Sequence, residues 1–468
     1  MPIATTNPAT GEVLRTFEPY DDVRVEAALA LAARAAAEWR HVPAAERAAV
    51  VGRAAEVLDR RREEFARLMT LEMGKPLQAA ADEAAKCAAA CRYYAEHGPA
   101  FVAPETLVDD ESGVGRVRYD PLGVVLAVMP WNFPFWQVVR FAAPALAAGN
   151  VGLLKHASNV PQCALALDEV FREAGAPAGA FQALLVESGR VDALVADPRV
   201  AAVTLTGSEG AGAAVGAAAG RALKPSVLEL GGSDPFVVLP SADLDAAART
   251  AVTARTINNG QSCIAAKRFV VHAAVYDAFV ERFAAGVRAL RVGDPMDAAT
   301  QVGPLATAQI RDDLDDQVRR SVAAGARLVC GGAPAGGRGF YYAPTVLADV
   351  TRDMPAAAEE TFGPVAAVLR ASDAGDALRL ANATPYGLGA SVWTGDAGEV
   401  ALFEAGLDAG SVFVNGMVVS DPRLPFGGVK RSGYGRELGA VGLRAFVNVK
   451  TVRVARAGAA PGPEHATE

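Results

Sequence analysis

The sequence predicts an α/β protein in which largely parallel sheets are covered by helices. Strand-like apolar runs alternate with helical segments along most of the chain, which is the pattern of such sheets. Several runs are apolar at every position, as strands buried on both faces are. The 468 residues are 51% hydrophobic, enough apolar material for about three domains.

The chain begins with a helical region and then turns to strands. Residues 21–98 carry Ala, Leu and Val at helical spacing, and Gly-Lys-Pro at 74–76 predicts a break between two long helices. Residues 115–119 and 122–129 are strand-like and are separated by an Asp-Pro turn. We expect the second of these strands to be buried.

Two alternating regions follow. The first has strand-like runs at 151–154, 181–186, 200–205 and 226–230, with helical segments between them. The second begins near Asp234, with strands expected at 235–239, 268–272, 326–330 and 391–394, a helix from Asp243, and another helical run at 276–290. A last strand is expected at 447–454, and the Ala-, Gly- and Pro-rich tail at 456–468 is expected to be disordered.

Composition excludes several classes of function. The net charge is −8 and no basic block occurs, so we expect no nucleic-acid partner. The Ala-rich run at 27–37 is interrupted by Arg34 and predicts a surface helix, so no membrane span is expected, and the N-terminus lacks a secretory pattern. Five scattered cysteines predict reduced thiols in a cytoplasmic protein, and scattered histidines predict no metal site.

A polar stretch at 258–263, Asn-Asn-Gly-Gln-Ser-Cys, lies between a helical segment and a strand-like run. A thiol at such a junction can lie where backbone N–H groups converge, which suits a thiolate nucleophile. The alternative is a buried structural thiol, because free cysteine is among the most buried residue types. Cys263 alone does not decide between the two.

Other candidate residues follow strands of the first region. Asn132 closes the run before a helix and could donate to an oxyanion, or it could be a helix cap. Lys155 follows its strand and could reach a cofactor ribose or phosphate, or be a solvated surface lysine. Residues 206–212 offer a helix N-terminus suited to phosphate, although Val215 replaces the third glycine of a G-x-G-x-x-G pattern.

Glu229 is an acid among apolar residues at the end of a strand. Burial raises the pKa of a carboxyl group and suits it to act as a general base, and the alternative is a paired structural carboxylate.

Five motifs in order resemble those of the aldehyde dehydrogenase superfamily. They are Trp131-Asn132-Phe133-Pro134, Leu228-Glu229-Leu230-Gly231-Gly232, Gly260-Gln261-Ser262-Cys263, Glu359-Glu360-Thr361-Phe362-Gly363-Pro364, and Pro425-Phe426-Gly427-Gly428-Val429-Lys430 with Ser432-Gly433. They extend over nearly the whole chain. The resemblance implies a Rossmann-like cofactor domain, an α/β catalytic domain and a small β flap that joins subunits into a homodimer or homotetramer.

The resemblance also implies roles for individual residues. Cys263 would be the nucleophile, Glu229 would activate the hydrolytic water, and Asn132 with the Cys263 N–H would form the oxyanion hole. Lys155 and Glu360 would hold ribose hydroxyls of the cofactor. Lys155 would also be one of the catalytic residues. The remaining cofactor-binding positions would be Trp131, Asn132, Ser158, Gly207, Ser208, Leu230 and Phe362.

The implied domain boundaries are as follows. The dinucleotide-binding domain would comprise 1–102 and 122–231, the catalytic domain 232–433, the flap 103–121 and 434–456, and the disordered tail 457–468.

Three further stretches are Leu154-Lys155-His156-Ala157-Ser158-Asn159-Val160, Leu228 to Pro235, and Ser262-Cys263 with Ala265-Ala266-Lys267-Arg268. Through them the chain most resembles, within the superfamily, the succinate-semialdehyde dehydrogenases with a short N-terminus. Arg140, six residues after Pro134, would bind the distal carboxylate of the substrate, unless it is a structural helix residue. Ile257 stands where many such enzymes have a second arginine six residues before the nucleophile. Ser420 and Arg423 are candidates to compensate, and Phe426 is expected near the substrate. The alternatives are a dehydrogenase of glutarate semialdehyde or an aliphatic aldehyde, and a non-catalytic binding protein of the same fold.

The cofactor is expected to be NADP or NAD. The NAD-preferring pattern of the family has Glu three residues after the lysine, and Ser158 stands there in this chain. Without that carboxylate a 2′-phosphate is not repelled, so the sequence predicts that NADP is accepted or preferred.

Overall fold

The computed structural model describes residues 3–457. The chain begins with an antiparallel hairpin, β1 and β2, that the sequence did not indicate, and then forms the predicted helical region. Asp21 caps its first helix by accepting a hydrogen bond from the Arg24 N–H, and Gly74 ends the third helix in the left-handed conformation that favours glycine. The elements are β1 (Ile3–Asn7), β2 (Glu12–Phe17), α1 (Asp22–Trp39), α2 (Ala44–Arg60), α3 (Arg62–Met73) and α4 (Leu77–Phe101).

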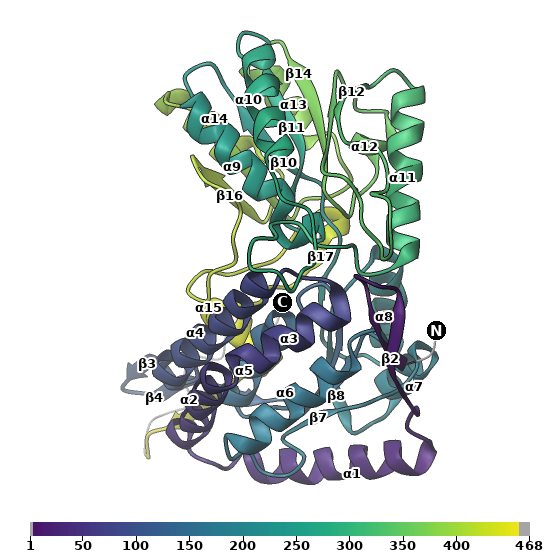
Figure 1. Cartoon of the computed structure of the whole chain (residues 1–468). Helices are drawn as coiled ribbons and strands as arrows, with labels where there is room; N and C mark the ends of the chain where they lie inside the picture. Colours follow the sequence, from purple (N-terminus) through teal and green to yellow (C-terminus); the bar gives the residue numbers. More distant parts are fainter. Residues whose placement is uncertain (1–2, 458–468) are drawn as a thin grey trace.

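A six-stranded sheet forms the lower half of the molecule in Figure 1. Its order is β17-β9-β8-β5-β6-β7, and every pair is parallel except β17 with β9. The strands are β5 (Val124–Met129), β6 (Val151–His156), β7 (Phe181–Ala183), β8 (Val200–Thr206), β9 (Ser226–Glu229) and β17 (Gly433–Tyr434). The helices that follow its strands are α5 (Trp136–Ala148), α6 (Pro161–Glu173), η1 (Ser188–Arg190), α7 (Val191–Ala196) and α8 (Glu209–Arg221). The predicted first sheet is therefore present.

Strand β6 is two residues longer than the sequence indicates. His156 remains in the sheet because its ring nitrogens lie 3.2 Å from the Met129 carbonyl and 2.9 Å from the Pro134 carbonyl. Lys155 therefore belongs to the strand, opposite Val128, and does not follow it. Strands β5, β6, β8 and β9 end at one edge of the sheet, which brings the candidate residues together there.

A seven-stranded sheet forms the upper half, in the order β12-β13-β14-β11-β10-β15-β16, parallel except for β12 with β13. Two apolar cores cover its faces. Its strands are β10 (Asp234–Val238), β11 (Ala266–His272), β12 (Arg327–Cys330), β13 (Thr345–Ala348), β14 (Val365–Ala371), β15 (Gly389–Trp393) and β16 (Ser411–Val414). Its helices are α9 (Leu244–Thr256), η2 (Ile257–Gly260), α10 (Tyr276–Arg288), α11 (Ala308–Ala323), α12 (Pro355–Ala358), α13 (Ala374–Asn382) and α14 (Ala397–Gly406). Together the two sheets give the aldehyde dehydrogenase-like α/β fold that the resemblance implies.

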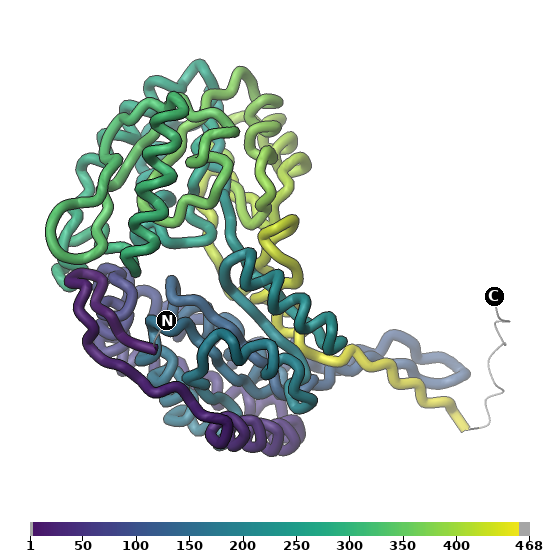
Figure 2. Tube along the Cα trace, turned by 90° about the vertical axis from the view of Figure 1, so that its right-hand side faces the viewer, coloured from purple at the N-terminus to yellow at the C-terminus, as the bar shows by residue number. Residues whose placement is uncertain are grey.

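A third, antiparallel sheet projects from the body, as Figure 2 shows. It consists of β3 (Glu105–Asp110), β4 (Gly113–Pro121) and β18 (Val447–Ala455). Residues 434–446, expected in the same flap, instead pack on the body as η4 (Arg444–Phe446) and α15 (Gly439–Leu443), after η3 (Lys430–Ser432) and β17. The other domain boundaries stay predictions, and residues 458–468 of the expected disordered tail lie outside the described residues.

No helix within residues 3–457 combines the length and the apolar character that crossing a membrane requires.

Candidate active site

Cys263 follows a turn with an uncommon backbone. Asn258, Asn259 and Gly260 have φ angles of 56°, 59° and 76°, in the left-handed region that residues other than glycine seldom occupy. A Cβ atom on Gly260 would lie 2.3 Å from the Gly363 carbonyl carbon, so this position requires glycine. Such a turn persists only where its surroundings hold it.

Side-chain amides supply that support. Asn259 Nδ2 donates to the Gly74 and Pro304 carbonyls, both at 2.9 Å, and its Oδ1 accepts from the Gly303 N–H at 2.8 Å. Asn258 Nδ2 donates to the Asn132 carbonyl at 2.6 Å. The turn before the cysteine is thus bound to both halves of the molecule.

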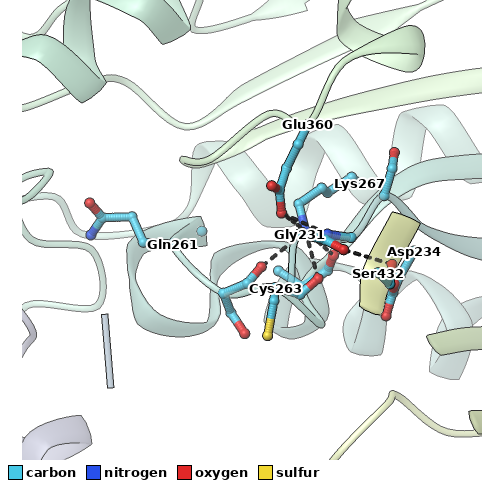
Figure 3. A network of polar contacts seen from close by, with 12 residues as sticks. Gly231, Asp234, Gln261, Cys263, Lys267, Glu360 and Ser432 are labelled. Carbon is cyan, nitrogen blue, oxygen red and sulfur yellow. Dashed lines mark hydrogen bonds and ion pairs between the residues drawn. The ribbon is translucent and has the colours of Figure 1, made fainter. Parts of the chain in front are cut away.

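Lys267, which the sequence did not single out as functional, holds the other side of the cysteine loop (Figure 3). Its fully buried ammonium donates to the carbonyls of Cys263 at 2.8 Å, Ser262 at 3.0 Å and Ala265 at 3.4 Å. The same nitrogen lies 3.5 Å from Glu360 Oε1. A lysine directly before an apolar strand was the available signal, because an ammonium in that place needs acceptors from nearby chain.

The Cys263 thiol is held mainly in its neutral form in the resting site. Burial raises its pKa to about 12, while the nearby charges of Arg140 and Lys267 act in the opposite direction. Formation of the thiolate therefore requires a proton acceptor or further positive charge at the site.

Asn132 lies beside the cysteine loop with its amide orientation set by two hydrogen bonds. Its Nδ2 donates to the Gln261 carbonyl at 3.1 Å, and its Oδ1 accepts from Gln137 Nε2 at 3.0 Å. The second hydrogen of Nδ2 is left for a ligand. None of the hydrogen bonds among the described residues uses the Cys263 N–H, so two donors are available at this place.

Glu229 is a buried carboxylate at the end of β9, with 2% of its surface exposed. Neither of its oxygens has a hydrogen-bond partner among the described side chains and backbone groups. Burial raises its pKa well above the usual value; Arg140 opposes this shift and Glu437 reinforces it. A Cβ atom on Gly427 would lie 2.7 Å from Glu229 Oε1, so this glycine leaves room for the carboxylate.

Arg140, the predicted carboxylate ligand, is 2% exposed and already has a carboxylate partner. Its Nε forms an ion pair with Glu437 Oε2, its Nη2 donates to Thr206 Oγ1 at 3.2 Å, and its guanidinium lies 4.7 Å from the centre of the Phe426 ring. Phe426 is buried as well. The observed contacts of Arg140 are those of a structural ion pair. Its binding to the carboxylate of the substrate stays a prediction.

Eight of the predicted site residues line one cavity of about 220 Å3: Trp131, Asn132, Gly207, Ser208, Leu230, Cys263, Glu360 and Phe362. Thr206, from the predicted segment 206–212, also lines it, and so do Gln137 and Ile310, which were not predicted. Gln137 had a signal in the sequence, because it and Arg140 are the polar residues of the otherwise apolar α5 and share one face at a spacing of three. Glu229, Lys155, Ser158, Arg140, Ser420 and Phe426 are not part of this lining.

The cavity suits a dinucleotide. Ser208 caps α8 through the Ala211 N–H, which places the N-terminus of that helix beside Gly207, where a phosphate would be favoured. Glu360 Oε1 is oriented by the Gly232 N–H at 2.9 Å. The Trp131 and Phe362 rings pack edge to face, with 5.7 Å between their centres, and form an apolar wall beside Cys263.

Lys155 and Ser158 lie at and just after the end of β6. Burial lowers the pKa of the Lys155 ammonium, and no hydrogen bond within residues 3–457 uses it, so the group is available to a polar ligand. Ser158 is half-buried in the turn between β6 and α6. No group of three or more metal-ligating side chains occurs in the described part of the chain.

Comparisons with known proteins agree with this geometry. The model of the aldehyde dehydrogenase family matches residues 1–452. A succinate-semialdehyde dehydrogenase [NADP(+)] of Mycolicibacterium paratuberculosis is 58% identical over 97% of this chain and 96% of its own length. The protein named succinate-semialdehyde dehydrogenase [NADP(+)] 1 in Mycobacterium tuberculosis H37Rv is 58% identical over 97% of this chain and 100% of its own length.

Two solved structures are also similar to this chain over nearly its whole length. The succinic semialdehyde dehydrogenase of Streptococcus pyogenes in complex with NADP+ is 37% identical, with a TM-score of 0.94 over 97% of this chain and 100% of the other. The structure of Gox0499, described for its cofactor and substrate selection, is 41% identical, with a TM-score of 0.95 over the same shares. The protein therefore belongs to the aldehyde dehydrogenase family.

Proposed function

We propose that the protein oxidises succinate semialdehyde to succinate with NADP as the electron acceptor. The observation that carries the activity is that Cys263 and the free amide hydrogen of Asn132 share a cavity that suits a dinucleotide. Glu229, buried without a hydrogen-bond partner among the described residues, is close enough to act electrostatically on the Cys263 thiol. The substrate and cofactor are supported by the full-length likeness to NADP-dependent succinate-semialdehyde dehydrogenases.

In the first step the Cys263 thiol loses its proton to solvent, and the thiolate adds to the aldehyde carbon, which forms a thiohemiacetal. Asn132 Nδ2 and the Cys263 N–H donate to the oxygen that becomes negative, and each such donor lowers a barrier by roughly 3 to 4 kcal/mol. A bound nicotinamide would supply the hydride acceptor, and loss of hydride would leave a thioester on Cys263.

Glu229 then takes a proton from water, and the resulting hydroxide attacks the thioester carbon. The C–S bond breaks, the carboxylate product leaves, and the thiolate returns. The raised pKa of Glu229 suits this role, because a base works best with a pKa near the working pH. Trp131 and Phe362 would cover the nicotinamide side, Leu230, Gly207 and Ser208 would border the dinucleotide, and Lys155 with Glu360 would bind ribose hydroxyls.

Substrate preference tests the proposal. We expect kcat/KM for succinate semialdehyde to exceed that for butanal, an uncharged aldehyde of equal length, by about 10- to 100-fold, because a charge-assisted contact binds only the distal carboxylate. Initial rates of reduced-cofactor absorbance with both aldehydes, and with glutarate semialdehyde, measure this. Equal efficiency with butanal would favour an aliphatic aldehyde as the substrate.

The cofactor preference depends on Ser158. We expect Ser158→Glu to raise KM for NADP by about 10-fold or more while KM for NAD falls, because the new carboxylate repels a 2′-phosphate and can accept hydrogen bonds from free ribose hydroxyls. Ser158→Gln, equal in size and uncharged, is the control. A variant that kept the wild-type ratio of the two KM values would contradict this role.

We also propose that the protein forms a homodimer or homotetramer through the projecting sheet of β3, β4 and β18. Leu107, Val449 and Val454 on this sheet are each at least half exposed in the single chain, as apolar residues of an interface would be. Sedimentation velocity of the full chain measures the assembly. A cytoplasmic location stays a prediction that the five free thiols support.

A further inference from the structure

A lysine that the sequence did not single out reaches the loop before the Pro-Phe-Gly-Gly motif. Lys86, on α4, donates from Nζ to Ser420 Oγ at 2.7 Å, across 334 residues of chain. The same nitrogen lies 4.3 Å from the centre of the Trp136 ring, at the start of α5. Lys86 is half-buried, so its ammonium is drawn out of bulk water but not sealed in the core.

The Lys86 ammonium has no carboxylate partner. Ser420 Oγ, a neutral acceptor, is its one hydrogen-bond partner within residues 3–457. The acids near it are engaged elsewhere: Glu83 pairs with Lys75, and Asp421 accepts from Arg423 at 2.5 Å. The site around Lys86 is thus short of negative charge.

The arginines that could otherwise bind a substrate carboxylate are either paired with a carboxylate or closed off by burial. Arg140 pairs with Glu437 inside the protein, and Arg423 is bound to Asp421 with 73% of its side chain exposed. Arg255, the arginine nearest to Ile257 in sequence, is 1% exposed and donates to the Gly260 carbonyl at 2.6 Å. Compared with these arginines, Lys86 is neither paired with a carboxylate among the described residues nor fully buried.

Lys86 also lies against the helix that forms part of the cavity wall. Its ammonium contacts the Trp136 ring, and the next residue of α5, Gln137, lines the cavity together with Cys263. The positive charge of Lys86 is thus placed beside the helix that an aldehyde bonded to Cys263 would meet.

We propose that Lys86, together with the Ser420 hydroxyl, binds the distal carboxylate of the substrate and replaces the arginine that is absent at Ile257. This inference rests on the proposed oxidation of succinate semialdehyde. Lys86 acts as a compact point charge with three donors, so it can hold Ser420 Oγ and a carboxylate oxygen together.

Lys86→Gln tests the inference. We expect kcat/KM for succinate semialdehyde to fall by about 10- to 100-fold, mainly through KM, while kcat/KM for butanal changes by less than about threefold. Lys86→Arg, which keeps the charge, should retain most of the preference. Lys224→Gln is the matched control, because Lys224 is also half-buried and donates to neutral acceptors, the carbonyls of Val195 and Asp197, away from the site.

The outcomes separate this inference from the proposed function. If the wild-type protein does not prefer succinate semialdehyde to butanal, the proposed function fails. If it does and Lys86→Gln keeps that preference, the role of Lys86 is overturned and the function stands. If Lys86→Gln loses activity toward both aldehydes, thermal unfolding curves show whether the variants are folded, and Lys86→Arg is then assayed with both aldehydes. A folded Lys86→Arg protein that is also inactive toward both would overturn the inference.

The pH dependence gives a second readout. Burial and Arg140 lower the pKa of Lys86 to about 8, while Cys87, Glu83 and Asp421 raise it. The ammonium is therefore lost as the pH rises through about 8, and the ratio of kcat/KM for succinate semialdehyde to that for butanal should fall there. In Lys86→Gln the ratio should not vary with pH; a wild-type ratio that stays flat from pH 7 to about 9 would contradict the inference.

Discussion

Cys263→Ala is expected to lower kcat by about 10^4-fold or more while the protein still folds and binds NADP. The reason is that the proposed reaction proceeds through two covalent intermediates on this sulfur, and no second thiol lines the cavity among the described residues. Steady-state rates of NADPH formation, together with cofactor titration by protein fluorescence, measure both parts of the expectation.

Cys330→Ala is the matched control for this variant. Cys330 is also half-buried, and burial also raises the pKa of its thiol, but it lies on the edge strand β12 of the seven-stranded sheet. Its replacement should leave kcat within about twofold of wild type, as substitutions away from a site usually do. Substantial aldehyde oxidation by Cys263→Ala would exclude the covalent route.

Glu229→Gln is expected to separate the two halves of the reaction. Thioester formation should proceed and release about one NADPH per subunit in a burst, and steady turnover should then be slower by about 10^2- to 10^4-fold. The reason is that glutamine cannot take a proton from the hydrolytic water. Stopped-flow absorbance measures the burst, and a variant with neither burst nor turnover would instead assign Glu229 to activation of the thiol.

The wild-type pH profile follows from the same residue. Because burial holds the pKa of Glu229 well above its usual value, the carboxyl is protonated, and inactive as a base, across a wider range of acid pH than an exposed glutamate. The rate of hydrolysis should therefore rise with pH through that raised pKa, and this rise should be absent from Glu229→Gln.

The sequence predicted much of the fold from alternation alone. Strands β5, β8, β10 and β11 were expected within one or two residues, because each is a compact apolar run bounded by turn residues. Strands β13 and β14 were not expected. The sequence of β14, Val-Ala-Ala-Val-Leu-Arg-Ala, has no alternation, and its apolar positions are equally compatible with a helix.

The site was predicted less completely, for a physical reason. Asn132 follows strand β5, and Cys263 and Glu360 lie just before strands β11 and β14, so the local sequence places each of them near a strand end. The contacts of Arg140 with Glu437 and of Lys86 with Ser420 join residues hundreds of positions apart. Tertiary packing sets such contacts, and no local spacing indicates them.

In the proposed reaction a thioester forms on Cys263, and Glu229 is needed to hydrolyse it. Intact-protein and peptide mass spectrometry of Glu229→Gln, quenched after mixing with succinate semialdehyde and NADP, tests this most directly. We expect a succinyl adduct on the peptide that contains Cys263, and we expect no adduct when NADP is omitted. An adduct on another residue, or an unmodified protein after a burst of NADPH, would contradict it.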